Sequence, residues 1–595
     1  MFLSNARSYW RFLKLKTEIV LDKWTSKSRY VLPKPVEGDH SAFDSESGET
    51  SDADTPLQPE VTISSQTEIG KPVIPSFLAN TPCSSLGIQG LLDLLNTTLG
   101  TSYTLDTPSI SFVLEDCIAQ NFDFGTVYGR LRSAWCDHEV TDIQMVLRKS
   151  EAEDIDWRRD AFDGNRIVDM VWIRPRRVWD LYSNRVVPWW SCRVGFRYGK
   201  HLRPISHAWL DEVDRVDELT PINGREWPVP IPKGANLDLI RIEMLNIGLE
   251  YTWLDVLCLR QRGGPREDLR EEEWKLDVPT IGGIYDGEPV VIYLSGLGLP
   301  LSLKEGDLES DRCWFRRAWT LQEIGRKRMI VGDTPDGPMH AKPIDEAGNY
   351  KDEILTKFYK QLKAADDSLY LYDTLSAMQD RISTYPVDKV AGLAFCLMTR
   401  SIPAYYESQS LEDAWSALIN ETDLWFRGML LFTYPEPGSA RKKWRPSWEQ
   451  VMTKSLPKNP DPMLTYTESA KDDLYRGLPI KRGIVRGLAV GGVKGSDRYG
   501  ELVVEDVRGI AHIFNIVASH QYPIPEDTYT LLGIHPAFMR DRHHGQYWVV
   551  GRLSNKRAHY KRFEKVSVFQ MADLEEIERI YELCSSVKPR SFILA

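Results

Sequence analysis

The sequence has no run of 18 apolar residues, no pair of cysteines at CxxC spacing, and no internal repeat. Without such an apolar run, no membrane-spanning helix is expected. The eight cysteines are scattered, so zinc-ribbon and thioredoxin-like sites are not indicated. The opening stretch also lacks the apolar core of a signal peptide, and reduced thiols in the cytoplasm are therefore expected.

The chain also lacks a phosphate-binding loop and an excess of basic residues. No GxxxxGK[ST] pattern occurs, so a P-loop nucleoside triphosphatase is not predicted. The formal net charge is −11, which disfavours nonspecific binding to nucleic acid. His543 and His544 have no second ligand pair at metal spacing, so no metal site is predicted.

Composition and apolar periodicity divide the 595 residues into six expected segments. They are an N-terminal helix (1–34), a disordered acidic linker (35–73), a helical subdomain (74–169), a central domain (170–400), a connecting helical and irregular region (401–479), and a C-terminal β-rich domain (480–595). The linker is predicted because nine acidic residues and no Lys or Arg occur over 35–70. Within the helical subdomain, single helices are predicted over 86–99 and 112–135. Alternating apolar runs in the last segment predict antiparallel strands and a closing helix.

In the central domain, apolar strands alternate with helices. Continuous apolar strands are predicted at 204–206, 252–257 and 290–294, and a helix capped by Asn236 separates the first two. This alternation predicts an α/β fold in which helices cover both faces of a parallel sheet.

Polar side chains occur at the ends of these strands. Ser206 ends the first strand, where a parallel sheet usually opens onto its ligand crevice, and Trp209 offers a stacking surface. The alternative is a capped strand end with a core Trp. Asp255 lies within the apolar second strand, where a buried carboxylate requires either a structural partner or a chemical role. Cys258 is more simply explained as a buried thiol than as a nucleophile.

Trp319 and Glu323 are four residues apart on a helix predicted over 315–325, and they therefore share a face. A carboxylate beside an aromatic ring is partly desolvated, which raises its pKa. Such a group suits a general acid or base, or a residue that binds a ribose hydroxyl. The alternative is a surface charge paired with Arg326, Lys327 or Arg328.

Together these segments resemble the fungal heterokaryon-incompatibility (HET) domain. The matching stretches, in family order, are ISHAW (205–209), WLDVLCLRQ (253–261), VVIYLSG (290–296), RRAWTLQE (316–323) and RISTYPVDKVAGLAF (381–395). The chain departs from the family pattern in having His207 for an aromatic residue and Leu210 for Gly. Leu259 and Arg260 replace Ile-Asn, and Ala391 replaces Tyr. These departures indicate a divergent member.

HET domains are thought to be remote relatives of TIR domains, so the resemblance implies a flavodoxin-like parallel sheet. In NAD-cleaving TIR domains, the Glu that corresponds to Glu323 is catalytic. The resemblance therefore implies a catalytic Glu323, with Ser206, Trp209, Asp255 and Trp319 lining a ligand crevice. NAD would be the substrate, and no resident cofactor is expected.

The same resemblance implies a role in fungal self/non-self recognition and regulated cell death. Two mechanisms remain open. In the first, which we expect, the module signals through self-association or a protein partner without chemistry. In the alternative, it is an NAD glycohydrolase whose NAD cleavage is toxic.

Deletion of residues 37–68 is expected to change the free energy of unfolding by less than about 0.5 kcal/mol, because a disordered segment makes few packing contacts. Thermal denaturation of the full chain and of the deletion variant measures this difference. A melting temperature lowered by several degrees would contradict the prediction.

Overall fold

The fold was obtained as a computed structural model. The residues that it describes are 72–107, 109–137, 142–168, 173–192, 202–286, 289–325, 327–365, 370–397, 399, 401–459, 473–534, 546–554 and 561–595. The helix expected over 1–34 and nearly all of the acidic linker expected over 35–73 lie outside these residues. No helix in the described ranges is long and apolar enough to cross a membrane.

The first described region is helical. Its helices are α2 (Ser76–Ala79), α3 (Cys83–Leu99), α4 (Ile110–Ala119), α5 (Phe124–Trp135) and α6 (Ile143–Asp160). The prediction of one helix over 112–135 is wrong, because the chain breaks between α4 and α5. Asn121 adopts a left-handed φ of 55°, and the Asp123 side chain accepts the Thr126 N–H to begin α5.

A six-stranded sheet forms the centre of the fold, with the order β10-β9-β5-β8-β3-β4. Its strands are β3 (Arg177–Asp180), β4 (Arg185–Pro188), β5 (Leu202–His207), β8 (Tyr251–Leu254), β9 (Val290–Tyr293) and β10 (Arg328–Ile330). The three predicted strands are parallel neighbours, with β5 between β8 and β9. Numbered along the chain, the four parallel strands have the order 2-1-3-4. The hairpin β3–β4 adds an antiparallel edge that the sequence did not predict.

Two predicted elements have different bounds. The strand expected over 252–257 ends at Leu254, and Asp255 is the first residue of the short helix α9 (Asp255–Cys258), where its carboxylate accepts the Val256 N–H. The helix expected over 315–325 is reduced to a 3₁₀ turn at Trp314–Arg316 and one helical turn, α12 (Thr320–Glu323). Between the two, Arg317 is extended, with φ −80° and ψ 138°.

The helix predicted after Asn236 is α8 (Leu237–Asn246), and the Asn236 side chain accepts the N–H groups of Asp238 and Leu239. Further short strands are β1 (Phe162–Asp163), β2 (Arg166–Ile167), β6 (Arg215–Glu218), β7 (Val229–Pro232) and β11 (Ile402–Pro403). Further helices are α7 (Trp189–Cys192), α10 (Arg270–Asp277), α11 (Ile281–Tyr285), α13 (Glu353–Ala364), α14 (Leu371–Gln379), α15 (Asp388–Ala391), α16 (Leu411–Glu421), α17 (Leu424–Thr433) and α18 (Trp448–Thr453).

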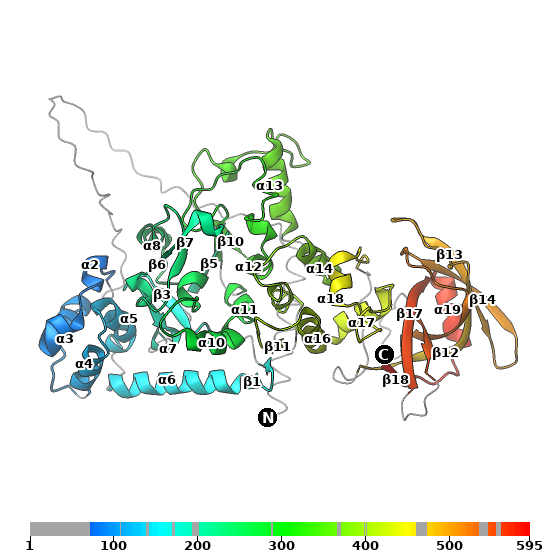
Figure 1. The fold of residues 1–595 in the computed structure, drawn as a ribbon, viewed down its shortest axis with the longest axis horizontal. Coiled ribbons are helices and arrows are strands. Elements are labelled where there is room, and N and C mark those ends of the chain that lie inside the picture. The colour runs from blue at the N-terminus through cyan, green and yellow to red at the C-terminus, as the bar shows by residue number, and fades with distance from the viewer. Residues whose placement is uncertain are drawn as a thin grey trace. The chain divides into compact units, whose positions relative to one another are not determined.

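The C-terminal region is β-rich and mainly antiparallel, as predicted. Its seven strands are β12 (Leu474–Arg486), β13 (Arg498–Glu505), β14 (Ala511–Ala518), β15 (Asp527–Gly533), β16 (Tyr547–Leu553), β17 (Lys561–Met571) and β18 (Arg590–Leu594). The pairing of β17 with β18 is parallel. The closing helix α19 (Leu574–Leu583) packs on a separate apolar cluster of these strands and is drawn in red in Figure 1.

Buried ion pairs join the helical region to the central sheet. Arg132 of α5 is fully buried, and its guanidinium donates to Asp180 at 2.8 Å, Glu250 at 2.7 Å and the Tyr251 hydroxyl at 2.7 Å. A charge in such a place needs partners, because transfer from water into the interior costs several kcal/mol. These contacts connect α5 to β3 and to the start of β8.

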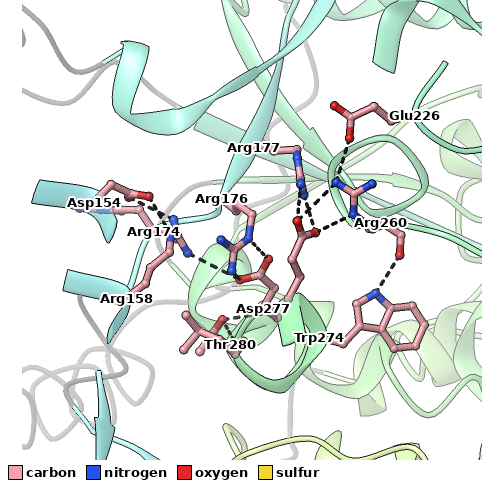
Figure 2. Close-up of polar contacts among 12 residues, drawn as sticks. Asp154, Arg158, Arg174, Arg176, Arg177, Glu226, Arg260, Trp274, Asp277 and Thr280 are labelled. Carbon is pink, nitrogen blue, oxygen red and sulfur yellow. Dashed lines mark hydrogen bonds and ion pairs between the residues drawn. The ribbon is translucent and has the colours of Figure 1, made fainter. Parts of the chain in front are cut away.

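A second set of ion pairs continues along the same edge of the sheet (Figure 2). The Asp277 carboxylate of α10 accepts a hydrogen bond from the Arg176 Nε at 2.7 Å, and it lies 3.6 Å from the Arg158 Nη1 of α6. Glu273, one turn earlier, pairs with Arg177 of β3 at 2.6 Å and with Arg260 at 3.3 Å. These ion pairs thus hold the helical region, the β3–β4 hairpin and α10 to one another.

Arg132→Met is expected to lower the free energy of unfolding by about 3–5 kcal/mol, because it leaves Asp180 buried without its counter-ion. Urea denaturation followed by circular dichroism measures the change. Lys149→Met is the control, because its pair with Glu153 at 4.0 Å is exposed to solvent and contributes little. Equal destabilisation by the two changes would contradict the assignment.

Candidate functional site

A cavity of about 300 Å³ lies at the carboxyl ends of β5 and β8. Its aromatic lining residues are Trp209, Trp253, Trp274, Tyr285, Trp319, Tyr385 and Tyr405. Its charged or titratable lining residues are His207, Arg215, Asp217, Asp255, Arg262, Arg317, Glu323 and Asp388. A small cavity with aromatic walls and a few polar groups is typical of a ligand site.

Asp255 is held by three donors at the first residue of α9. The His207 Nε2 lies 2.9 Å from one carboxylate oxygen, and the Trp209 indole donates to the other at 3.2 Å. The third donor is the N–H of Val256. Burial opposes ionisation, but His207 and these hydrogen bonds hold the pKa of Asp255 below its ordinary value. Asp255 is therefore held in its ionised form.

Glu323 is the second carboxylate. The Ser206 hydroxyl of β5 donates to it at 2.6 Å, and the Trp314 indole donates to that hydroxyl at 2.8 Å. Burial raises the pKa of Glu323 to about 7, against the lowering effect of the Ser206 hydrogen bond. The negative charge of Asp255 contributes to the same rise in the pKa of Glu323. The structure thus pairs Glu323 with the Ser206 hydroxyl, whereas Arg326, one of the alternative partners, lies outside the described residues.

A third carboxylate, Asp388 of α15, was missed by the sequence reasoning. It accepts the Tyr405 hydroxyl at 2.7 Å and a hydrogen bond from the Trp319 side chain. Burial raises its pKa to about 6. The available signal was an acidic residue next to apolar positions in the 381–395 stretch, comparable to the signal that singled out Asp255.

Arg381 fixes the segment that carries Glu323. Its Nη1 donates to the Arg317 carbonyl and to the Thr320 hydroxyl, both at 2.6 Å. The guanidinium is buried, which lowers its pKa to about 10, and it also lowers the pKa of Glu323. Arg381 therefore positions α12 without lining the cavity.

All five residues named from the sequence are brought together. Trp209, Asp255, Trp319 and Glu323 line the cavity, and Ser206 lies against Glu323. Cys258 is buried, does not line the cavity, and burial raises its pKa to about 12. Within the described ranges, no group of three His, Cys, Asp or Glu side chains is placed to hold a metal ion. The His543 and His544 pair lies outside those ranges.

Comparison of the chain with known protein families, with characterised proteins and with solved structures gives no significant match. The chemistry of the cavity is therefore the basis for a functional assignment.

Glu323→Gln is expected to flatten the pH dependence of stability between about pH 4.5 and pH 7. The pKa of Glu323 rises from an ordinary 4.5 to about 7 on folding, so the folded chain binds more protons in this window. The resulting stabilisation is complete below about pH 4.5 and is lost as the pH rises through 7. It corresponds to roughly 3 kcal/mol.

Urea denaturation at pH values from 4.5 to 8 measures this slope in the parent and in the Gln variant. Glu305→Gln, at an exposed position, controls for the loss of one negative charge. An unchanged slope in Glu323→Gln would show that Glu323 is ionised in the fold over the whole range.

Proposed function

We propose that residues 170–400 form a heterokaryon-incompatibility type of domain that cleaves the glycosidic bond between nicotinamide and ribose in NAD. The observation that carries this proposal is the pair of carboxylates in one aromatic cavity. The pKa of Asp255 is lowered, while that of Glu323 is raised to about 7. Environments that push two carboxylate pKa values apart are typical of acid–base sites in glycoside chemistry.

The sheet supports the same proposal. The order 2-1-3-4 of its parallel strands matches the first four strands of a flavodoxin-like sheet, 2-1-3-4-5. In such sheets ligands bind outside the carboxyl ends of the strands, which is where the cavity lies. We therefore interpret the central domain as a shortened flavodoxin-like sheet with an added antiparallel edge.

In the proposed reaction, the bond between C1′ of the ribose and the nicotinamide nitrogen breaks. Its electron pair remains on the nitrogen, so nicotinamide leaves as a neutral molecule. Positive charge then develops on the ribose, and the ionised Asp255 stabilises it across the cavity. Glu323 in its ionised form orients a ribose hydroxyl and accepts the proton of the water that attacks C1′. The products are ADP-ribose, nicotinamide and a proton.

The aromatic residues support binding of the leaving group. The rings of Trp209 and His207 are stacked, with centroids 5.7 Å apart, and the Trp319 ring lies beside that of Tyr405 at 6.4 Å. Such surfaces suit a planar pyridine ring. Depletion of NAD would connect the domain to regulated cell death and self/non-self recognition. We propose that self-association or a protein partner controls the activity of the domain.

Glu323→Gln is expected to lower the rate of NAD cleavage roughly 100-fold or more, because it removes the proton acceptor and preserves the shape of the side chain. Nicotinamide release by the purified full chain measures the rate, and total NAD in yeast that expresses the chain measures the effect in cells. Glu305→Gln should match the parent in both assays.

The signalling mechanism without chemistry makes the opposite prediction. NAD would then stay constant in yeast that expresses the parent chain, and Glu323→Gln would have no special effect. Growth arrest at constant NAD would overturn the glycohydrolase and favour signalling by self-association.

A further inference from the structure

Three arginines line the cavity, and two of them have acidic partners. Arg262 forms an ion pair with Glu407 and lies over the Tyr385 ring. Arg215 pairs with Glu212 at 3.5 Å. Among the residues that the structure describes, the Arg317 guanidinium has neither an ion pair nor a hydrogen bond.

The backbone of Arg317 is nevertheless firmly fixed. Its carbonyl accepts from Arg381 at 2.6 Å and from the Thr320 hydroxyl at 2.8 Å. Its neighbour Ala318 donates its N–H to the Ile382 carbonyl at 2.8 Å, so residue 317 forms an isolated parallel bridge with 382. The side chain of Arg317 thus lines the cavity from a fixed backbone, and less conformational entropy is lost when a ligand binds to it.

The acidic groups near Arg317 do not contact its guanidinium. Asp388, Glu323 and Asp211 act on it through space, without a hydrogen bond to the guanidinium. Burial raises the pKa of Asp388 to about 6 and that of Glu323 to about 7, so Glu323 in particular is only partly ionised at neutral pH. A guanidinium keeps its charge throughout this range. Among the described residues, the half-buried cation therefore has no counter-ion in direct contact.

We infer that Arg317 binds the phosphate of a ribosyl phosphate unit in the cavity and selects phosphorylated ligands over their nucleosides. The guanidinium offers a planar fork of donors that matches phosphate oxygens. The volume of about 300 Å³ is at the lower end for ligand cavities, and it fits one mononucleotide rather than a whole dinucleotide. The identity of the base, nicotinamide, rests on the proposed function, whereas the anion site does not.

Calorimetric titration of the full chain tests this inference. In a Glu323→Gln background, which slows turnover, nicotinamide mononucleotide should bind about 10- to 100-fold more tightly than nicotinamide riboside, the scale of charge-assisted hydrogen bonds. Arg317→Met should abolish this preference, and Arg317→Lys should retain part of it because it keeps the charge and loses the fork. If Arg317→Met does not fold, a reduced preference for nicotinamide mononucleotide over nicotinamide riboside in Arg317→Lys tests the same role.

Arg262→Met is the matched control, because Arg262 lines the same cavity but already has an acidic partner. It should keep the preference for the phosphorylated ligand. A preference that survives in Arg317→Met, or one that is lost equally in Arg262→Met, would overturn the role of Arg317 while leaving NAD cleavage untouched.

Pyrophosphate, an anion without a base, separates this inference from the proposed function. If neither nicotinamide compound binds but pyrophosphate binds in an Arg317-dependent way, the anion site stands and the proposed substrate is wrong. If pyrophosphate and both nicotinamide compounds bind equally to the parent and to Arg317→Met, or bind to neither, the anion site is overturned.

Discussion

The cavity depends on the parallel register of β5 against its two neighbours. Ile205 lies opposite Leu254 of β8 and opposite Val291 of β9, so these strands end at the same edge of the sheet. This register places His207 beside Asp255, the residue that follows β8. A slip of one residue would exchange the faces of Ser206 and His207. The Ser206 hydroxyl would then no longer point to Glu323, and Asp255 would lose His207.

Indole N–H groups donate hydrogen bonds at each of the three partly buried carboxyl groups of the cavity, either directly or through a hydroxyl. Trp209 donates to Asp255, Trp319 to Asp388, and Trp314 to the hydroxyl that donates to Glu323. An indole N–H satisfies an oxygen without adding a positive charge. Glu323 and Asp388 can therefore keep raised pKa values, which an arginine in direct contact would lower. Some of the 19 tryptophans of the sequence thus take part in the polar chemistry of the cavity, and not only in the core.

The sequence predicted the parallel strands from local apolar patterns, and it predicted that the five candidate residues lie close together from one topological rule and the family resemblance. It did not predict that Asp255 begins a helix, since the apolar residues on both sides of Asp255 continue the strand pattern. The break near Asn121 was also missed, because a single left-handed residue interrupts an otherwise helical pattern. The contact of Trp314 with Ser206 joins residues 108 positions apart and follows only from the packed fold.

One difference between the sequence and the heterokaryon-incompatibility pattern that it resembles lies beside the cavity. Arg260 stands where that pattern has Asn, and it pairs with Glu226 at 2.8 Å and with Glu273 (Figure 2). Its backbone carbonyl accepts the Trp274 indole at 2.8 Å, and Trp274 lines the cavity. An Arg at this position reaches both carboxylates, whereas an Asn is too short and uncharged to pair with them. Arg260 therefore holds the segment after α9 to α10, the helix that carries Trp274 of the cavity wall. The ion pairs that hold the helical region to the sheet therefore also support the cavity, and a change at Arg176 or Arg177 would reach it through α10.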